Sequence, residues 1–248
     1  MKFTAHAMRR TAALGLLTLA AACTTTPPVP IPSKPAAPEN VDIPPPRPRA
    51  PGAAAPTFQP PQQLADGTRL TLNYGLSPEQ NVWHLRSAWN VAALNCLQVS
   101  YSGMAEEYGN FLNAHEADLR SINTSLDRTF RAEHGTGYAR IRDTYMTRVY
   151  NYFALPPAKR YFCDAMQGVA QRHAAANPAD LRAWSTTELA NVEAAFDAFY
   201  DDFEQWRVNV AEWDRLYGAE YGAPYGVYPQ SYTAPVTVGP TSTEQAGQ

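Results

Sequence analysis

The stretch SPEQNVWHLRSAWNVAALNCLQV (Ser77–Val99) indicates most clearly how the chain folds. Its apolar residues recur at steps of three and four, the spacing that places side chains on one face of an α-helix; they are Val82, Leu85, Trp89, Ala92, Cys96 and Val99. Ser77 precedes Pro78 and has Gln80 three residues later, which is the capping box of a helix N-terminus. The stretch predicts a helix of roughly 22 residues with Cys96 on its buried face.

Three further segments show the same periodicity. The chain predicts a second helix over about residues 104–133, a third from Tyr138 to Leu155, and a short fourth helix that starts at Pro156 and Pro157. Their apolar stripes are Tyr108, Phe111, His115, Leu119, Ile122, Leu126 and Phe130; then Tyr138, Ile141, Tyr145, Val149 and Tyr152; then Phe162, Met166, Val169 and His173. Each stripe is expected to face a common core.

The last apolar stripe is much longer than the others. It follows NPAD (Asn177–Asp180), a second capping pattern with Asn177 as the cap, and continues from Leu181 to Tyr217. A helix of this length would measure about 60 Å, and STTE (Ser185–Glu188) is itself a capping box. We expect either a break or kink at STTE or a helix that extends beyond the bundle. The opposite side is acidic and is predicted to face solvent; it carries Glu193, Asp197, Asp201, Asp202 and Glu204.

These patterns predict an all-α fold, an antiparallel bundle of about five helices over residues 77–217. Residues 65–76 precede it, and there Leu70, Leu72 and Tyr74 alternate with polar residues as in a short strand. The other β-leaning run is 232–238. Residues 65–76 therefore either pair with that run or form an extended strap across the helices.

Proline and glycine are concentrated at the two ends of the chain. Residues 24–61 hold 14 of the 22 prolines, so residues 23–64 are expected to be a disordered tether of polyproline-like chain, on the order of 100 Å at full reach. A docking site for a proline-binding partner is the alternative. Residues 218–248 are rich in Tyr, Gly and Pro. We expect a low-complexity, disordered tail there, or a sticky segment that lies on the bundle, on a sugar polymer or on a neighbouring protein.

The first 22 residues have the pattern of an export signal. Lys2, Arg9 and Arg10 precede an apolar run that ends at Ala22 and is too short to span a bilayer. Cys23 follows three alanines. This arrangement resembles the lipobox of bacterial lipoproteins, and the alternative is an ordinary signal peptide with an incidental cysteine.

The lipobox resemblance implies a mature chain that starts at Cys23 and carries diacylglycerol and acyl chains there, with no other cofactor. Several acyl chains anchor a protein to a membrane without spanning it. Thr24 in place of an aspartate implies, by the same resemblance, the outer membrane, with the protein facing the periplasm or the cell surface.

Net charge limits the classes of partner that the protein can bind, and cysteine content predicts its disulfide. Removal of residues 1–22 takes away three positive charges, so the formal net charge changes from −3 to −6. This argues against nucleic acid as a partner, because nucleic acid binding requires basic surfaces. Once Cys23 is lipid-modified, Cys96 and Cys163 remain, and in an exported protein they are expected to form one disulfide rather than two buried thiols.

The sequence contains no recognisable catalytic motif. H-E-x-x-H, G-x-S-x-G, S-x-x-K, C-x-x-C and a phosphate-binding glycine loop are all absent, and no metal site is predicted. His115 interrupts an apolar stripe beside Glu116, and we interpret it as a hydrogen-bonded core or boundary histidine, with a catalytic base or ligand as the alternative. One basic concentration could bind an anion or could pair with the acidic last helix; it comprises Arg128, Arg131, Arg140, Arg142 and Arg148.

Aromatic residues are dense, and most fall on the helix stripes. The best candidates for an exposed interaction surface lie where the last helix is expected to extend past the bundle; they are Trp206, Trp213, Tyr217, Tyr221 and Tyr225. Three functions follow as hypotheses. The first is a non-enzymatic scaffold or accessory subunit of a cell-envelope assembly, with an envelope protein or peptidoglycan as partner. The second is a periplasmic binding module for glycan, peptidoglycan or a small ligand. The third is an enzyme of unfamiliar type.

Overall fold

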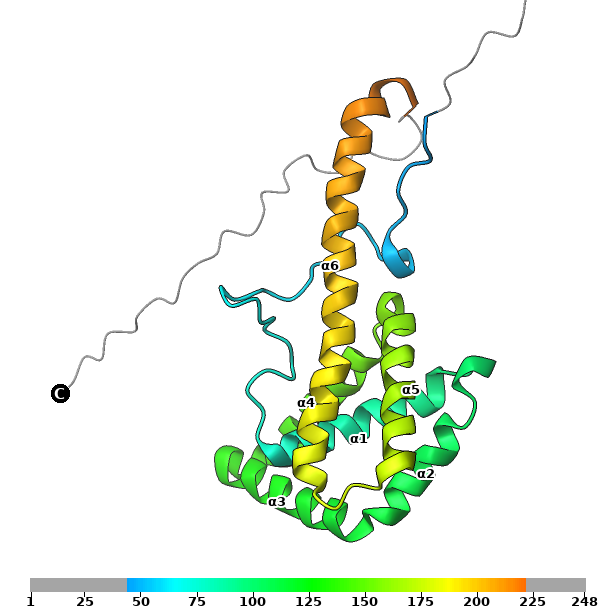
Figure 1. Ribbon diagram of the computed structural model, residues 1–248. Coiled ribbons are helices and arrows are strands. Elements are labelled where there is room, and N and C mark those ends of the chain that lie inside the picture. The colour runs from blue at the N-terminus through cyan, green and yellow to red at the C-terminus, as the bar shows by residue number, and fades with distance from the viewer. Residues whose placement is uncertain (1–43, 222–248) are drawn as a thin grey trace, which may run out of the picture. The chain divides into compact units, whose positions relative to one another are not determined.

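The computed structural model describes residues 44–221. Within this part of the chain the elements are helices, which confirms the all-α fold (Figure 1). The α-helices are α1 (Pro78–Asn95), α2 (Met104–Ala114), α3 (Glu116–His134), α4 (Tyr138–Phe153), α5 (Lys159–Ala176) and α6 (Leu181–Tyr221). Short 3-10 turns lie at Pro51–Ala53 (η1), Val99–Tyr101 (η2), Gly135–Gly137 (η3) and Pro156–Ala158 (η4). The expected signal peptide and lipid site lie outside the described residues.

Helix α1 is the central element, because it packs against each of the other five α-helices. Its N-terminus forms the predicted capping box: the Ser77 hydroxyl accepts from the Gln80 amide, and the Gln80 side chain accepts from the Ser77 amide. The helix ends at Asn95, earlier than the periodicity indicated. Val99, predicted to lie on the buried stripe, is therefore 91% exposed, and Tyr101 takes the buried position beyond the helix end.

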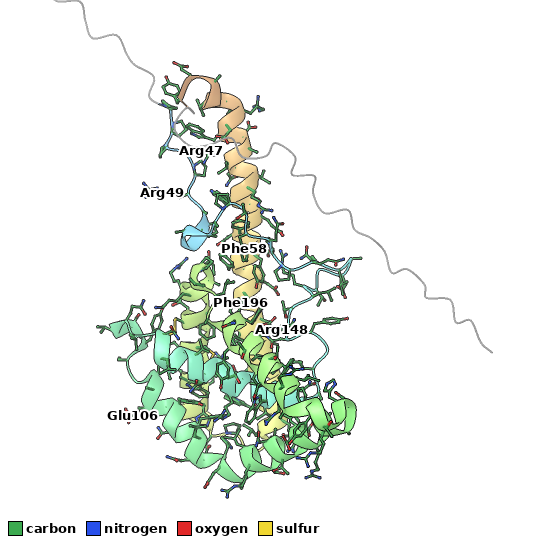
Figure 2. The ribbon with its side chains drawn as sticks, turned by 180° about the vertical axis from the view of Figure 1, so that it is seen from behind. Arg47, Arg49, Phe58, Glu106, Arg148 and Phe196 are labelled. Atoms are coloured by element: carbon green, nitrogen blue, oxygen red, sulfur yellow. A yellow bond between two sulfur atoms is a disulfide. The ribbon has the colours of Figure 1, made fainter. Side chains whose placement is uncertain are left out.

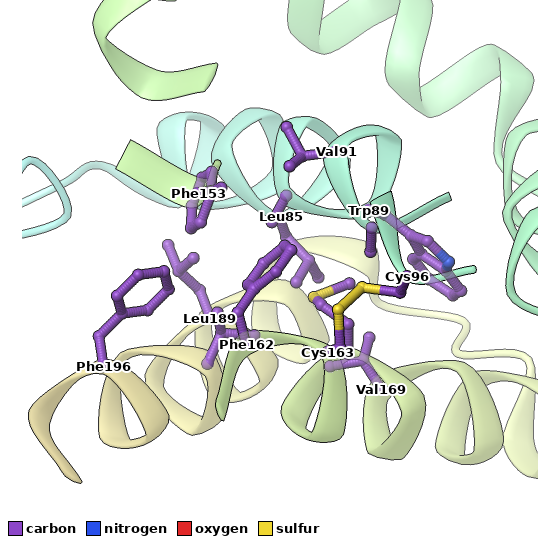
Figure 3. Close-up of a cluster of buried hydrophobic side chains, with 14 of the residues drawn as sticks. Leu85, Trp89, Val91, Cys96, Phe153, Phe162, Cys163, Val169, Leu189 and Phe196 are labelled. Carbon is purple, nitrogen blue, oxygen red and sulfur yellow. A yellow bond between two sulfur atoms is a disulfide. The ribbon is translucent and has the colours of Figure 1, made fainter. Parts of the chain in front are cut away.

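All six α-helices contribute buried side chains to one core. Leu85 and Trp89 of α1 meet Phe153 of α4, Phe162 of α5 and Phe196 of α6 in one buried cluster (Figure 3). The disulfide between Cys96 and Cys163 closes this cluster at the end of α1 and confirms the predicted pairing (Figure 3). It links helix α1 covalently to α5, so the end of α1 has a fixed position in the domain.

Two predicted elements differ in their boundaries. The single helix expected over residues 104–133 is divided at His115, whose backbone leaves the helical region (φ −113°, ψ 21°), so that α2 and α3 are separate helices. The short fourth helix is longer than expected: Pro156–Ala158 form a 3-10 turn, and α5 then continues for 18 residues. The apolar stripe of α4 is exposed in its first half, where Ile141 is solvent-accessible, because only Val149 and Phe153 reach the core.

Helix α6 is continuous over 41 residues, with no break at Ser185–Glu188. Of the two alternatives for this region, the long helix is correct, and its C-terminal half extends past the other helices (Figure 1). Its N-terminal cap is Asp180, whose carboxylate accepts from the amides of Arg182 and Ala183. Asn177, expected to be the cap, instead ends α5 with φ 37°. The apolar side of this C-terminal half of α6 must therefore be covered by a segment other than the bundle helices.

Residues 65–76 contain no strand; a single antiparallel bridge joins Gln63 to Arg69. Turns occupy residues 65–66 and 72–75, so the segment is a turn-rich strap rather than a fully extended one. The possible pairing run 232–238 lies outside the described residues, as does most of the expected low-complexity tail.

Candidate functional site

Residues 44–58 lie along the half of α6 that extends past the bundle (Figure 2). The indole Nε1 of Trp206 donates to the Pro48 carbonyl at 3.1 Å, and that of Trp213 donates to the Pro45 carbonyl at 2.7 Å. Arg47 adds a two-pronged ion pair with Asp214, at 2.8 and 2.7 Å. A polyproline-like chain has no internal hydrogen bonds, so its carbonyls are free to accept these donors.

The prediction that Trp206 and Trp213 form an exposed surface is therefore wrong. Their exposed fractions are 7% and 9%, because the proline-rich segment covers them. Tyr217 is half-buried and packs on the Trp213 ring at 5.6 Å, whereas Tyr221 remains exposed. Tyr225 lies outside the described residues.

The same segment continues into the body of the domain. Phe58 packs on the rings of Phe199 and Phe203 on α6, with centroids 5.6 and 5.2 Å apart, and Arg207 donates to its carbonyl at 2.5 Å. Gly52 lies against the Pro157 backbone. The assignment of residues 23–64 to a free tether is thus too long: residues 44–64 belong to the folded domain, because α6 offers them apolar rings and hydrogen-bond donors.

The strap, residues 65–76, is held to α6 by Arg69. The Arg69 side chain is 2% exposed; its Nη2 atom lies 2.7 Å from an Asp201 oxygen and 3.0 Å from a Glu204 oxygen. Asp197 is 3.8 Å from Arg69 Nε. The acidic side of α6, predicted to face solvent, is therefore partly covered, since it provides the binding site for this one buried guanidinium. Asp201 still keeps most of its surface in water.

A second polar contact fixes the strap about two turns of α6 before Asp201. Glu193, also expected to face solvent, is partly buried and accepts from Thr71 Oγ1 at 2.6 Å, Asn73 Nδ2 at 2.6 Å and the Tyr152 hydroxyl at 3.1 Å. Burial raises the pKa of the Glu193 carboxyl, although these three hydrogen bonds act in the opposite direction. Both strap residues are thus held at fixed positions over α6.

Asn73 extends this network to α1. Its Oδ1 atom lies 2.5 Å from His84 Nδ1, and the Tyr145 hydroxyl lies 2.5 Å from His84 Nε2. Since Asn73 Oδ1 can only accept, Nδ1 carries the proton, and Nε2 accepts from Tyr145. Burial lowers the pKa of His84 to about 4, so the ring is neutral near pH 7. The His84 side chain is completely buried.

Between the strap and α6 lies a groove of about 300 Å³. Its lining residues come from the proline-rich segment, the strap and helices α4 and α6; they are Phe58, Gln59, Pro61, Leu70, Thr71, Leu72, Tyr152, Leu155 and Tyr200. Most of these side chains are apolar or aromatic, and the hydroxyls of Thr71 and Tyr152 are directed to Glu193. The groove is open to solvent on one side, and its apolar lining can accommodate a small ligand.

His115 is part of a different buried group. Its Nε2 atom lies 3.2 Å from that of His173, whose Nδ1 atom lies 2.6 Å from Glu107. Burial lowers the pKa of His115, and the neighbouring His173 lowers it further. The rings of Trp89, Phe111 and Trp184 surround His173. The interpretation as a hydrogen-bonded core histidine is confirmed, and this closed packing gives a substrate no access to either imidazole.

The arginine candidates do not form one site. Arg131 binds Asp127 and the Tyr138 hydroxyl, and Arg142 binds Asn123 and lies 3.6 Å from Asp127. Their carboxylate partner is thus on α3, and the expected pairing of these two with the last helix is wrong. Arg128, Arg140 and Arg148 are exposed on α3 and α4.

The sequence predicted few of the residues that shape the groove. Phe58 lies in a segment without periodicity, Arg69, Thr71 and Asn73 occupy the polar positions of the alternation in residues 65–76, and the sequence pattern places Glu193 on a solvent-facing side of its helix. The one available signal was a single arginine, Arg69, in a strap opposite a helix with five acidic residues.

Comparisons with known proteins add no further assignment. No protein-family model, no curated protein and no solved structure matches the chain. None of the helices within residues 44–221 is both long and apolar enough to cross a membrane. In the same residues, no three His, Cys, Asp or Glu side chains gather in a way that could hold a metal ion.

Proposed function

We propose that this protein is a lipid-anchored, non-enzymatic component of the bacterial cell envelope, attached through Cys23 to the outer membrane and presenting a rigid helical domain to a partner. The observation that carries the proposal is the attachment of residues 45–48 to Trp206, Trp213 and Asp214. A chain that leads from a lipidated Cys23 would enter the domain beside the C-terminal end of α6.

This attachment has a mechanical consequence. Helix α6 would serve as a spacer of about 60 Å between the entry point and the bundle core. Membrane binding through acyl chains holds a protein firmly while the polypeptide remains in water. A rigid spacer of this kind suits a scaffold or accessory subunit, because it fixes the distance between the point where the tether enters the domain and the partner-binding head.

The head carries an apolar tip that suits contact with a partner protein. Leu94, Leu97 and Val99 are 67%, 78% and 91% exposed, and the disulfide at Cys96 holds their loop in place. Exposed apolar groups on a fixed loop mark interaction sites more often than scattered surface leucines do.

Membrane attachment is tested with Cys23→Ser. The variant should leave the membrane fraction and accumulate in soluble form, whereas the wild-type chain should require detergent for extraction. Continued membrane association of Cys23→Ser would contradict a lipid anchor at this residue.

The partner is tested by in-cell photocrosslinking. A benzophenone amino acid at Val99 should capture one envelope protein in a fixed ratio, identified by mass spectrometry. The matched control is Val208, which is 56% exposed on α6, outside the tip. Equal products from both positions, or none from Val99, would contradict the scaffold function.

A second candidate function, a binding module, is favoured by the groove of about 300 Å³. It does not exclude the first, because the groove and the tip use different residues. Wild-type protein purified from the envelope should then contain a co-purifying small molecule, detectable by mass spectrometry of an organic extract.

A further inference from the structure

The groove keeps its shape because its two walls are fixed independently. Arg69 is bound by Asp201 and Glu204 on one side of the strap's apolar residues, and Asn73 is bound by Glu193 on the other. Leu70 and Leu72 lie between these contacts and are held over α6. On the opposite wall, Phe58 is fixed by the rings of α6. The groove is therefore preformed.

The chemistry of the lining indicates an apolar occupant. Leu70 is 39% exposed at the groove although it is a large apolar residue, and Leu72 and Leu155 line the same space. The hydroxyl of Tyr152 is already bonded to Glu193. The lining thus offers few free donors to a sugar ring, while its carbon surface suits an alkyl chain or an aromatic ring.

The charge at one end of the groove determines which polar head group a bound apolar molecule can carry. Tyr200 lines the groove, and Asp197 and Glu204 lie one turn before and after it on the same side of α6. Arg69 binds Glu204 closely but approaches Asp197 only to 3.8 Å, and the Asp197 side chain is 44% exposed. The Arg69 guanidinium lies over the Tyr200 ring at 5.4 Å, but the three carboxylates around it, those of Asp197, Asp201 and Glu204, leave this end of the groove with a net negative charge. A net negative charge attracts a cation and repels an anion.

We propose that this groove binds a cationic amphiphile: an apolar chain between the strap and Tyr200, with an ammonium head beside Asp197. This site rests on the second candidate function, the binding module, and does not depend on the scaffold function.

The experiment is isothermal titration of the full mature chain with dodecyltrimethylammonium, below its micelle concentration. Sodium dodecanoate, the anionic probe of equal chain length, is titrated in parallel. We expect one cationic probe per protein, bound at least tenfold more tightly than dodecanoate. Absence of binding, or equal binding of both probes, would overturn the proposal.

Two variants locate the site. Leu72→Trp fills the groove and should weaken binding at least tenfold, while Leu216→Trp, the same change at an exposed position of α6 away from the groove, should not. Asp197→Asn should remove the preference for the cationic probe and leave apolar binding in place.

Circular dichroism melting checks that each variant folds, and Leu70→Trp replaces Leu72→Trp if the latter unfolds. Binding that persists in the groove-filled variant would overturn the proposal. Val99 crosslinking in that variant should be unchanged, so failure of the groove and failure of the scaffold are distinguishable.

Discussion

Among the described glycines, Gly52 is the one whose substitution by alanine should disturb the neighbouring backbone most. Its φ is +54°, and a Cβ atom there would lie 1.9 Å from the Pro157 carbonyl oxygen, a distance that requires the backbone to move. Gly52→Ala should therefore push residues 44–58 away from η4 and lower the free energy of unfolding by about 2–4 kcal/mol, measured by urea titration.

Gly67 provides the matched control for this prediction. It also has a positive φ, +88°, but nothing lies within 4 Å of its added Cβ. Gly67→Ala should cost only the conformational strain, about 1–2 kcal/mol. Equal losses in the two variants would show that the contact with Pro157 has no energetic role.

His84 should make the stability of the domain depend on pH. Burial lowers its folded-state pKa to about 4, below its ordinary value of 6.5, so the unfolded chain binds a proton first as the pH falls. The stability that the neutral ring contributes is fully present above pH 6.5 and is lost as the pH falls toward 4. Between pH 7 and 4.5 the expected loss is about 2–3 kcal/mol.

Glu193 modifies this pH dependence with the opposite sign. Its pKa is raised in the folded state, so protonation in acid favours the folded chain and offsets part of the loss from His84. Denaturant titrations of wild type and His84→Gln at pH 7 and 4.5 separate the two. The wild type should lose more stability than the variant; parallel losses would assign the acid sensitivity to other groups, such as His115.

Among the elements, the helices whose faces meet the core were predictable from sequence. The stripes of α1, α2, α3 and α5 are set by spacing alone, and most of their residues are buried as expected, including Trp89, Phe111 and Phe162. The sequence-based predictions of burial were wrong where a segment distant in the sequence covers the residue. Trp213 lies on the apolar stripe of α6 but past the expected end of the bundle, so it was predicted to be exposed. Nothing in a proline-rich sequence indicates that its carbonyls will cover an indole.

The disulfide shows how a link between elements contributes to stability. Cys96 and Cys163 are separated by 67 positions and join the end of α1 to α5. Closing a loop of this length in the unfolded chain is worth about 4 kcal/mol in the chain-entropy model. The double variant Cys96→Ala/Cys163→Ala should melt about 10 °C lower than wild type in differential scanning calorimetry.

Reducing agent supplies the control for the disulfide prediction. It should lower the melting temperature of wild type toward that of the double variant and leave the variant unchanged. An unchanged wild-type melting temperature after verified reduction would mean that packing alone holds α1 against α5.

At the scale of the whole molecule, the N-terminal boundary of the domain depends on contacts that cannot be predicted from amino-acid composition. Residues 24–61 have the composition of one continuous linker, yet the part from Pro44 onward is docked. The composition of a segment indicates that it cannot bury a core by itself. It does not indicate whether the segment can pack against another element and cover that element's side chains. The groove has the same origin, since it exists only where the docked segment and strap meet α6.

The docked segment leads to the last prediction, which concerns proteolysis. Trypsin can cleave after Arg49, which is followed by Ala50, and not after Arg47, which is followed by Pro48. In wild type, cleavage after Arg49 should be slow because residues 45–48 are bound to α6. Trp206→Phe/Trp213→Phe keeps an aromatic, though smaller, ring at each position and removes both indole donors, whose loss costs about 1 kcal/mol each.

The double variant should therefore be cut after Arg49 at least tenfold faster than wild type, as followed by mass spectrometry, with little change in the circular dichroism melting curve. Trp184→Phe, the same substitution at a partly buried position elsewhere on α6, is the control and should leave the rate unchanged. Because the cut separates residues 23–49 from the helices, it would also release the domain from its proposed membrane anchor. Equal cleavage rates in wild type and double variant would show that the indole donors do not hold the segment in place.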